Sequence, residues 1–158
     1  MAGTTSKRVF AIRFEREALA GYIDPVTFLR PEGIELISPA GTVSVLPYPD
    51  VKVICFVKDF DSFSGWKENR LFAARPKSEG LWVRFRFRDA DVIDGVLPHN
   101  LLAWEAEGYT IAPPDPSFQS QRVFIPRTAI TEARVLGVVG TPIRQRRAKP
   151  GQLEMFDR

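Results

Sequence analysis

The chain has 158 residues, of which 44% are hydrophobic and 26% charged, with a formal net charge of +3. This balance excludes a disordered chain, and no segment reaches the roughly 18 to 20 apolar residues that a membrane-spanning helix needs. Cys55 is the only cysteine, which excludes an intramolecular disulfide and a cysteine metal cluster. We expect it to be a buried thiol in a cytoplasmic protein.

The first predicted unit covers residues 8–57 and consists of short apolar runs separated by glycine and proline. In the first run, Phe10, Ile12 and Phe14 share one face by period-2 alternation, which is typical of a strand. Glycines open the next two runs and allow the sharp bends of a small sheet. The runs are residues 10–14, 21–23, 33–39, 45–47 and 51–54.

The next segment, residues 58–81, is too aromatic for a flexible linker. Its larger apolar residues are Phe60, Phe63, Trp66, Leu71 and Phe72, among many charges. We expect this connector to pack across the junction between two units, with a strand at residues 69–74.

The second predicted unit, residues 82–138, repeats the five blocks of the first in the same order. Gly21 matches Gly95 near the start, and Pro47 matches Pro126 near the end, so the offset between the units grows only slightly along the chain. Such a repeat indicates duplication of one supersecondary unit. The matching runs are residues 83–87, 95–97, 108–114, 124–126 and 130–133, and we align Val83, Phe85 and Phe87 with Phe10, Ile12 and Phe14.

We therefore predict an all-β protein. Two tandem small SH3-like barrels, residues 8–57 and 82–138, are joined by the irregular connector 58–81 and followed by a basic tail, residues 139–158. Nothing in either unit shows a sustained helical period.

These blocks resemble the Sm-like (LSm/Hfq) barrels, and residues 124–131 are similar to the second motif of the bacterial members. The resemblance implies bent five-stranded sheets that form homo-oligomers by pairing their edge strands. It also implies a nucleotide contact at Arg127, which occupies the lysine position of a lysine–histidine pair, with Thr128 in place of the histidine. Residues 51–60 are also similar to a segment of an uncharacterised bacterial family.

Three arginines, Arg84, Arg86 and Arg88, alternate along one run of the second unit. They could form a phosphate-binding stripe for nucleic acid, because guanidinium groups pair bidentately with phosphate. The alternative is a solvated strand face whose arginines pair with nearby acids. The spacing of Arg84 and Arg88, followed by Asp115 and Ser117, also resembles the PilZ cyclic-dinucleotide receptors, although Ser120 replaces the glycine of that motif.

The tail carries the whole charge excess. Five basic and two acidic residues lie in 141–158, so the part of the chain before the tail is electrically balanced. The cations Arg144, Arg146, Arg147 and Lys149 favour polyanions such as nucleic acid. The residues Gln152, Leu153, Met155 and Phe156 resemble the bacterial sliding-clamp-binding peptide. The alternative is a tail that folds back onto its own barrel.

Catalysis finds little support in this sequence. His99 is the only histidine and lies in a predicted loop without a neighbouring nucleophile. Asp89, Asp91 and Asp94 flank a predicted turn, where aspartate serves backbone hydrogen bonding. We expect a non-enzymatic scaffold without metal or cofactor that binds no membrane, associated with nucleic acid through its tail. The alternatives are a DNA-transaction accessory protein recruited to the sliding clamp and a PilZ-like receptor.

Overall fold

The computed structural model describes residues 6–61, 66, 71–114 and 120–140, and within them the regular structure is almost entirely β. Ten strands and three short 3₁₀ segments follow one another, and these ranges contain no α-helix. The elements are β1 (Lys7–Arg13), β2 (Leu19–Ile23), β3 (Ile34–Ile37), β4 (Val43–Leu46), η2 (Tyr48–Asp50), β5 (Val51–Val57), β6 (Gly80–Phe87), β7 (Val92–Leu97), η3 (Leu101–Ala103), β8 (Gly108–Ile111), β9 (Ser120–Pro126), η4 (Arg127–Ala129) and β10 (Ile130–Val139).

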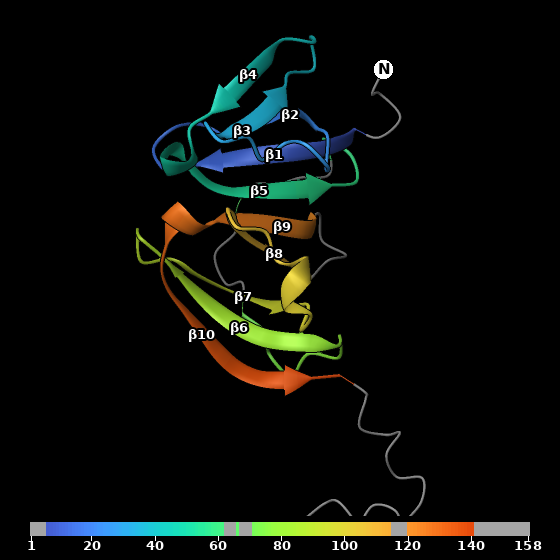
Figure 1. Cartoon of the computed structure of the whole chain (residues 1–158), viewed down its shortest axis with the longest axis vertical. Helices are drawn as coiled ribbons and strands as arrows, with labels where there is room; N and C mark the ends of the chain where they lie inside the picture. Colours follow the sequence, from blue (N-terminus) through green and yellow to red (C-terminus); the bar gives the residue numbers. More distant parts are fainter. Residues whose placement is uncertain (1–5, 62–65, 67–70, 115–119, 141–158) are drawn as a thin grey trace, which may run out of the picture.

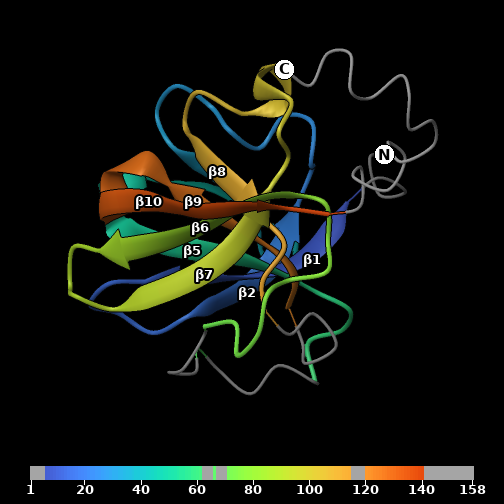
Figure 2. The ribbon, with the colours of Figure 1, turned by 90° about the horizontal axis from the view of Figure 1, so that it is seen from below.

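The strands form two antiparallel sheets. A seven-stranded sheet has the order β4-β3-β2-β1-β5-β9-β8, and a three-stranded sheet has the order β10-β6-β7 (Figure 1). Seen from below, the three strands of the smaller sheet lie across the front of the molecule (Figure 2). The all-β prediction is therefore confirmed.

The predicted division into two closed barrels is not what the described residues form. The strands of the second half are divided between the two sheets. β8 and β9 belong to the larger sheet, because β9 pairs with β5 of the first half as well as with β8. Between β7 and β8, the pairing is a single bridge from Val96 to Ala112. The two sheets diverge from that bridge, and no closed barrel results.

The strand register nevertheless repeats between the two halves. In β1 and β2, Val9 lies opposite Gly21, and in β6 and β7, Val83 lies opposite Gly95. The distance along the chain from Val9 to Val83 equals that from Gly21 to Gly95. The same glycine therefore stands at the same place in both hairpins.

The last strand of each half repeats its register as well. Arg13 lies opposite Val51 after a bulge, and Phe87 lies opposite Ile130 next to a bulge. The short 3₁₀ segments η2 and η4 precede these last strands, and each has a proline at its N-cap. Proline suits this position because it fixes φ and has no N–H to satisfy.

The alignment of the first strands is corrected by one residue. Val9 and Ala11, and not Phe10 and Ile12, occupy the positions that correspond to Val83 and Phe85. A shift of one residue in a strand exchanges its two faces. The alternation of Phe10 and Phe14 did not identify the corresponding positions, because apolar residues cover both faces of β1.

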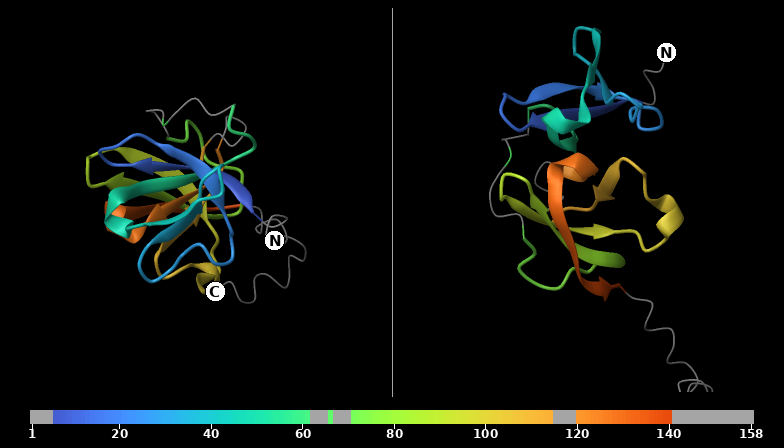
Figure 3. Two further views of the ribbon diagram at one scale, coloured as in Figure 1. Left: turned by 90° about the horizontal axis from the view of Figure 1, so that it is seen from above. Right: turned by 60° about the vertical axis from the view of Figure 1, so that its left-hand side comes forward.

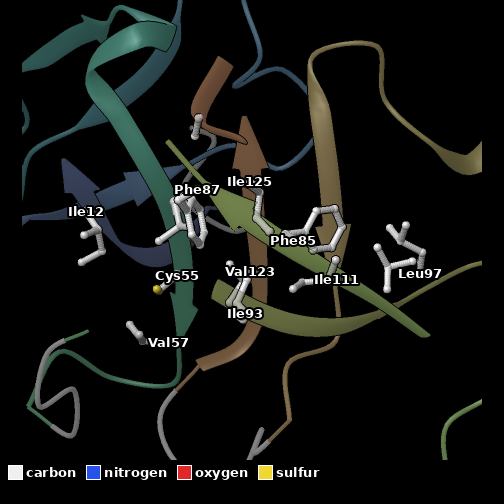
Figure 4. Packing of buried hydrophobic residues seen from close by; sticks show 13 residues of the cluster. Ile12, Cys55, Val57, Phe85, Phe87, Ile93, Leu97, Ile111, Val123 and Ile125 are labelled. Carbon is white, nitrogen blue, oxygen red and sulfur yellow. The ribbon is translucent and has the colours of Figure 1, made fainter. Parts of the chain in front are cut away.

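Two apolar clusters fill the interior, one on each side of β1 and β5. The first contains Phe124 of the second half among residues of the first half; its buried members are Val9, Ala11, Ile23, Phe28, Ile34, Leu36, Leu46, Val51, Ile54 and Phe124. The second is centred on the second half (Figure 4) and contains Ile12, Val53, Cys55, Val57, Val83, Phe85, Phe87, Ile93, Leu97, Ile111, Val123, Ile125 and Ala129. Each cluster therefore draws residues from both halves.

The connector packs as expected where it is described. Phe60 and Trp66 contact the second cluster, and the backbone N–H of Phe72 donates to Asp94 Oδ2 at 3.1 Å. Residues 71–74 form bends and not the predicted strand, and residues 69–70 lie outside the described ranges. In the part of the chain that the structure covers, no helix is long and apolar enough to cross a membrane.

Candidate functional site

The predicted arginine stripe is engaged with the protein itself. Arg84 donates from Nε and Nη2 to the two carboxylate oxygens of Asp94 at 2.6 and 3.0 Å. This bidentate bond raises the pKa of Arg84. Arg86 lies 3.8 Å from Glu132 of β10 and is half exposed. Both guanidinium groups thus have carboxylate partners, which reduces the positive charge that the strand offers to a phosphate.

Arg88 lies beyond the end of β6 and binds backbone instead. Its Nη2 donates to Pro49 O at 2.7 Å, and its guanidinium stacks 3.8 Å from the centre of the Phe14 ring. Arg88 therefore ties the second half to the η2 region of the first. Of the two arginines of the PilZ-like spacing, Arg84 is bound to Asp94 and Arg88 to this junction; Asp115 and Ser117 lie outside the described residues.

Arg127 lies in η4, whose next residue, Thr128, accepts from Arg88 Nη1 at 3.3 Å. Its Nη1 donates to the Tyr109 hydroxyl at 3.0 Å, and its guanidinium lies 5.1 Å from the centre of that ring. The guanidinium of Arg127, like those of Arg84 and Arg88, is therefore engaged with a neighbouring part of the protein. The tail residues predicted to bind nucleic acid or a clamp lie outside the described residues: Arg144, Arg146, Arg147, Lys149, Gln152, Leu153, Met155 and Phe156.

The groups considered for catalysis are spread over the molecule. His99 is exposed, and its Nε2 lies 3.4 Å from a carboxylate oxygen of Glu79. Cys55 is buried, as expected. Among the described residues, no three His, Cys, Asp or Glu side chains are close enough to hold a metal ion.

The aspartates near the β6–β7 turn do more than serve the backbone hydrogen bonds of a turn. Asp94 lies within β7 and is fully buried, where its carboxylate also accepts from Trp82 Nε1 at 3.3 Å. Asp89 and Asp91 each lie 2.9 Å from the ammonium of Lys52 on β5. The predicted role in the turn accounts for one contact of this cluster, in which the Asp91 N–H donates to Asp89 Oδ1 at 3.1 Å. It does not account for the contacts with Lys52.

Lys52 is the buried charge at the junction of the two halves. Its side chain is 8% exposed, and its ammonium lies 5.1 Å from the centre of the Phe87 ring and 5.4 Å from that of Trp66. A buried ammonium needs anionic partners, because desolvation is costly. The sequence feature that could have indicated this contact is the single lysine within the apolar run of residues 51–57.

Among the described residues, two end strands of the sheets, β4 and β10, have no further strand beside them and carry exposed apolar residues. β4 ends the larger sheet and presents Val43 and Val45, which are 55% and 42% exposed. β10 ends the smaller sheet and presents Val135 and Val138, which are 58% and 62% exposed. The two edges lie at opposite ends of the long axis (Figures 1 and 3). Unpaired strands of this kind are templates for pairing with another chain.

Two neighbouring pockets lie near the junction of the halves. They have volumes of about 370 and 400 Å³ and share the lining residues Glu105, Thr110 and Arg122. We call the pair the interunit groove and each pocket one of its lobes. The first lobe is bordered by β1, β5 and the loop after β2, and the second by β7, β8 and η3.

Comparison with known proteins gives one match, to a family model that covers most of the chain. Searches of curated proteins and of solved structures find no match. The model of DUF6982, described as a family of unknown function, matches residues 5–137, which include all but the last two residues of β10. Because this match covers most of the sequence, the chain belongs to the DUF6982 family.

Proposed function

We propose that this protein is a non-enzymatic scaffold subunit, built from two Sm-like units, that assembles head to tail through its open sheet edges. The observation that carries the proposal is the pairing of β5 with β9. This pairing joins the last strand of the first unit to the fourth strand of the second. The corresponding strands, β10 and β4 respectively, are end strands of the two sheets among the described residues.

The internal pairing supplies a register for the proposed contact. Ile54 lies opposite Phe124, Cys55 opposite Val123, and Phe56 opposite Arg122. The fourth strand of the first unit corresponds to the fourth strand of the second, and Leu46 matches Ile125. The last strands correspond at the same spacing along the chain, and Val51 matches Ile130.

Applying that offset pairs β10 of one copy with β4 of the next. The expected neighbours are Ala133 with Val45, Arg134 with Ser44, and Val135 with Val43. Val45 corresponds to Phe124, which is fully buried in the internal contact, whereas Val45 itself is 42% exposed. Pairing between copies would cover this side chain and its neighbours, which supports the proposal.

The two edges differ from each other, so the contact is heterologous. Repetition of such a contact produces a ring if the rotation closes and a filament if it does not. A scaffold of this kind needs no catalytic residue.

A disulfide trap tests the register. We expect a mixture of the single variants Val43→Cys and Val135→Cys to form a cross-linked heterodimer under mild oxidation, because antiparallel neighbours have Cβ atoms about 4.5–5.5 Å apart. Val26→Cys mixed with Val135→Cys is the matched control, because Val26 is 85% exposed and lies outside both edges. Cross-linking in the control alone, or in neither mixture, would refute head-to-tail pairing.

The hypotheses of nucleic-acid association and of sliding-clamp recruitment rest on the composition of the tail. They are compatible with a scaffold, because an assembly that carries several basic tails would bind more tightly than one tail through its linked weak contacts. The dependence of binding on salt distinguishes the two hypotheses, because only the first relies on the cations of the tail.

A further inference from the structure

We infer that the interunit groove is a binding site for a small organic phosphate with a planar, apolar body. This site is separate from the sheet edges on which the proposed assembly depends. The chemical class follows from three properties of the groove: its excess of cations, its aromatic walls and its bounded volume.

The first lobe is bordered by three cations and one carboxylate. Lys7, Arg8 and Arg122 line it, together with Glu105. Among the described residues, Lys7 and Arg122 have no carboxylate within ion-pair distance, and Arg8 uses one N–H for the Lys58 carbonyl at 3.3 Å. Glu105 accepts from the Thr110 hydroxyl at 3.2 Å. The lobe therefore has an excess of two positive charges, which matches a phosphate dianion.

The strand register explains why these cations stand together. Arg122 of β9 lies directly opposite Phe56 of β5, and Phe56 lies opposite Val9, two residues from Lys7. Alternation places Lys7, Phe56 and Arg122 on the same face of the larger sheet. The site is thus formed only because β9 pairs across the two units.

Aromatic side chains form part of the walls of both lobes. Phe28 and Phe56 line the first lobe, and Trp104 and Tyr109 line the second. The indole N–H of Trp104 donates to Pro98 O at 2.7 Å, which fixes the orientation of that ring. Ligand sites commonly combine apolar or aromatic walls with a few converging polar groups. A planar body can lie against these rings while Arg122, on the shared wall, holds the phosphate.

The volume of the groove favours a small molecule. Each lobe falls in the range of about 300–1,000 Å³ that is typical of small-molecule sites. Together the lobes are large enough for one phosphate and one ring system. A polymer would require contacts that continue beyond the groove, and the neighbouring Glu79 opposes a further phosphate at the end of the second lobe.

Calorimetric titration of the full chain with adenosine 5′-monophosphate, inorganic phosphate and adenosine tests this inference. We expect the monophosphate to bind more tightly than either fragment. Arg122→Gln should weaken its binding about tenfold or more, because a charge-assisted hydrogen bond is lost. Arg16→Gln is the matched control, because Arg16 is exposed and follows the far end of β1.

Two results would overturn the inference. One is the absence of monophosphate binding at millimolar concentration. The other is equal loss in Arg122→Gln and Arg16→Gln, which would indicate attraction by overall charge and not a site. Unchanged circular dichroism of Arg122→Gln excludes unfolding as the cause of a loss. The cross-linking of Val43→Cys with Val135→Cys is a separate measurement, so the groove and the assembly can fail independently.

Discussion

Phe124 of β9 lies directly opposite Ile54 of β5, and both side chains are fully buried in the same apolar cluster. The Phe124 ring also meets the Phe28 ring edge to face, with 5.6 Å between their centres. A residue of the second unit thus completes the core of the first. The two units depend on each other for stability, although they repeat the same register.

Replacement of Phe124 by alanine should therefore destabilise the whole chain. We expect a loss of about 3–5 kcal/mol in the free energy of unfolding, the usual cost of removing a buried phenylalanine side chain. Urea denaturation followed by tryptophan fluorescence and by circular dichroism measures it, and the two transitions should coincide. Leu102→Ala is the control, because Leu102 is 95% exposed. Independent unfolding of the two halves would contradict the shared core.

Lys52 offers a test of the junction. Replacement of Lys52 by methionine keeps most of the apolar stem but leaves the carboxylates of Asp89 and Asp91 close together without their cation. We expect destabilisation of about 3 kcal/mol, reduced to the extent that water reaches the partly exposed aspartates. Arg134→Gln, which breaks the exposed pair with Glu132, should cost much less. Equal stability of both variants would show that the buried pair contributes no more than a surface pair.

Gly108 is required by a close approach of two backbones. A Cβ atom at this position would overlap the carbonyl oxygen of Ile125 and lie 2.8 Å from Phe124 Cζ. Gly108→Ala should thus destabilise the protein by about 1–3 kcal/mol, the usual cost of overpacking. At Gly137 the nearest atom is 3.9 Å away, so Gly137→Ala should have little effect. Thermal denaturation of the two variants shows whether the loss of stability comes from the steric clash at Gly108 or from replacing any glycine of the sheets.

The hydroxyl of Tyr48 makes a contribution to stability that depends on alkaline pH. Burial raises the pKa of Tyr48, and the carboxylates of Glu107 and Glu32 raise it further. The folded state therefore favours the protonated phenol, whose O–H donates to Arg30 O at 2.6 Å. This contribution to stability is complete below the unfolded pKa near 10 and is lost as pH rises through the folded pKa.

A comparison of the wild type with Tyr48→Phe isolates this effect, because phenylalanine cannot ionise. Below pH 10 the variant should be less stable by about 1 kcal/mol, the net value of one hydrogen bond. The difference should shrink at higher pH as the wild type loses the bond. A difference that stays constant across this range would show that the hydroxyl does not titrate with folding.

The repeat could be predicted because its signals are local. Gly21 and Gly95 occupy the same register position, where a side chain would collide with the neighbouring strand. Pro47 and Pro126 precede the two 3₁₀ segments. These residues are determined by the backbone path of each unit, so their spacing survives even where the other side chains differ.

The pairing between the units could not be predicted in the same way. The sequence pattern assigns Phe124 to its own unit, and nothing in residues 120–126 indicates that β9 also pairs with β5. Period-2 alternation identifies a face only when the other face is polar. In β1 both faces are covered, so Phe10 and Val9 gave equally plausible registers. Arg122 became a site candidate only through its place opposite Phe56.

The tail provides the last test, in which electrostatic and apolar binding give opposite results. If the cations of residues 144–149 bind nucleic acid, affinity should fall steeply with salt, and neutralising Arg144, Arg146 and Arg147 should reduce the salt slope by up to about three charges. If Phe156 inserts into a sliding clamp, binding should be almost independent of salt. Phe156→Ala should then cost roughly 2 kcal/mol or more, as expected for a buried aromatic anchor. Titration against duplex DNA, single-stranded RNA and a purified clamp at two salt concentrations separates these outcomes, and binding to none of them would leave the edge-mediated scaffold alone.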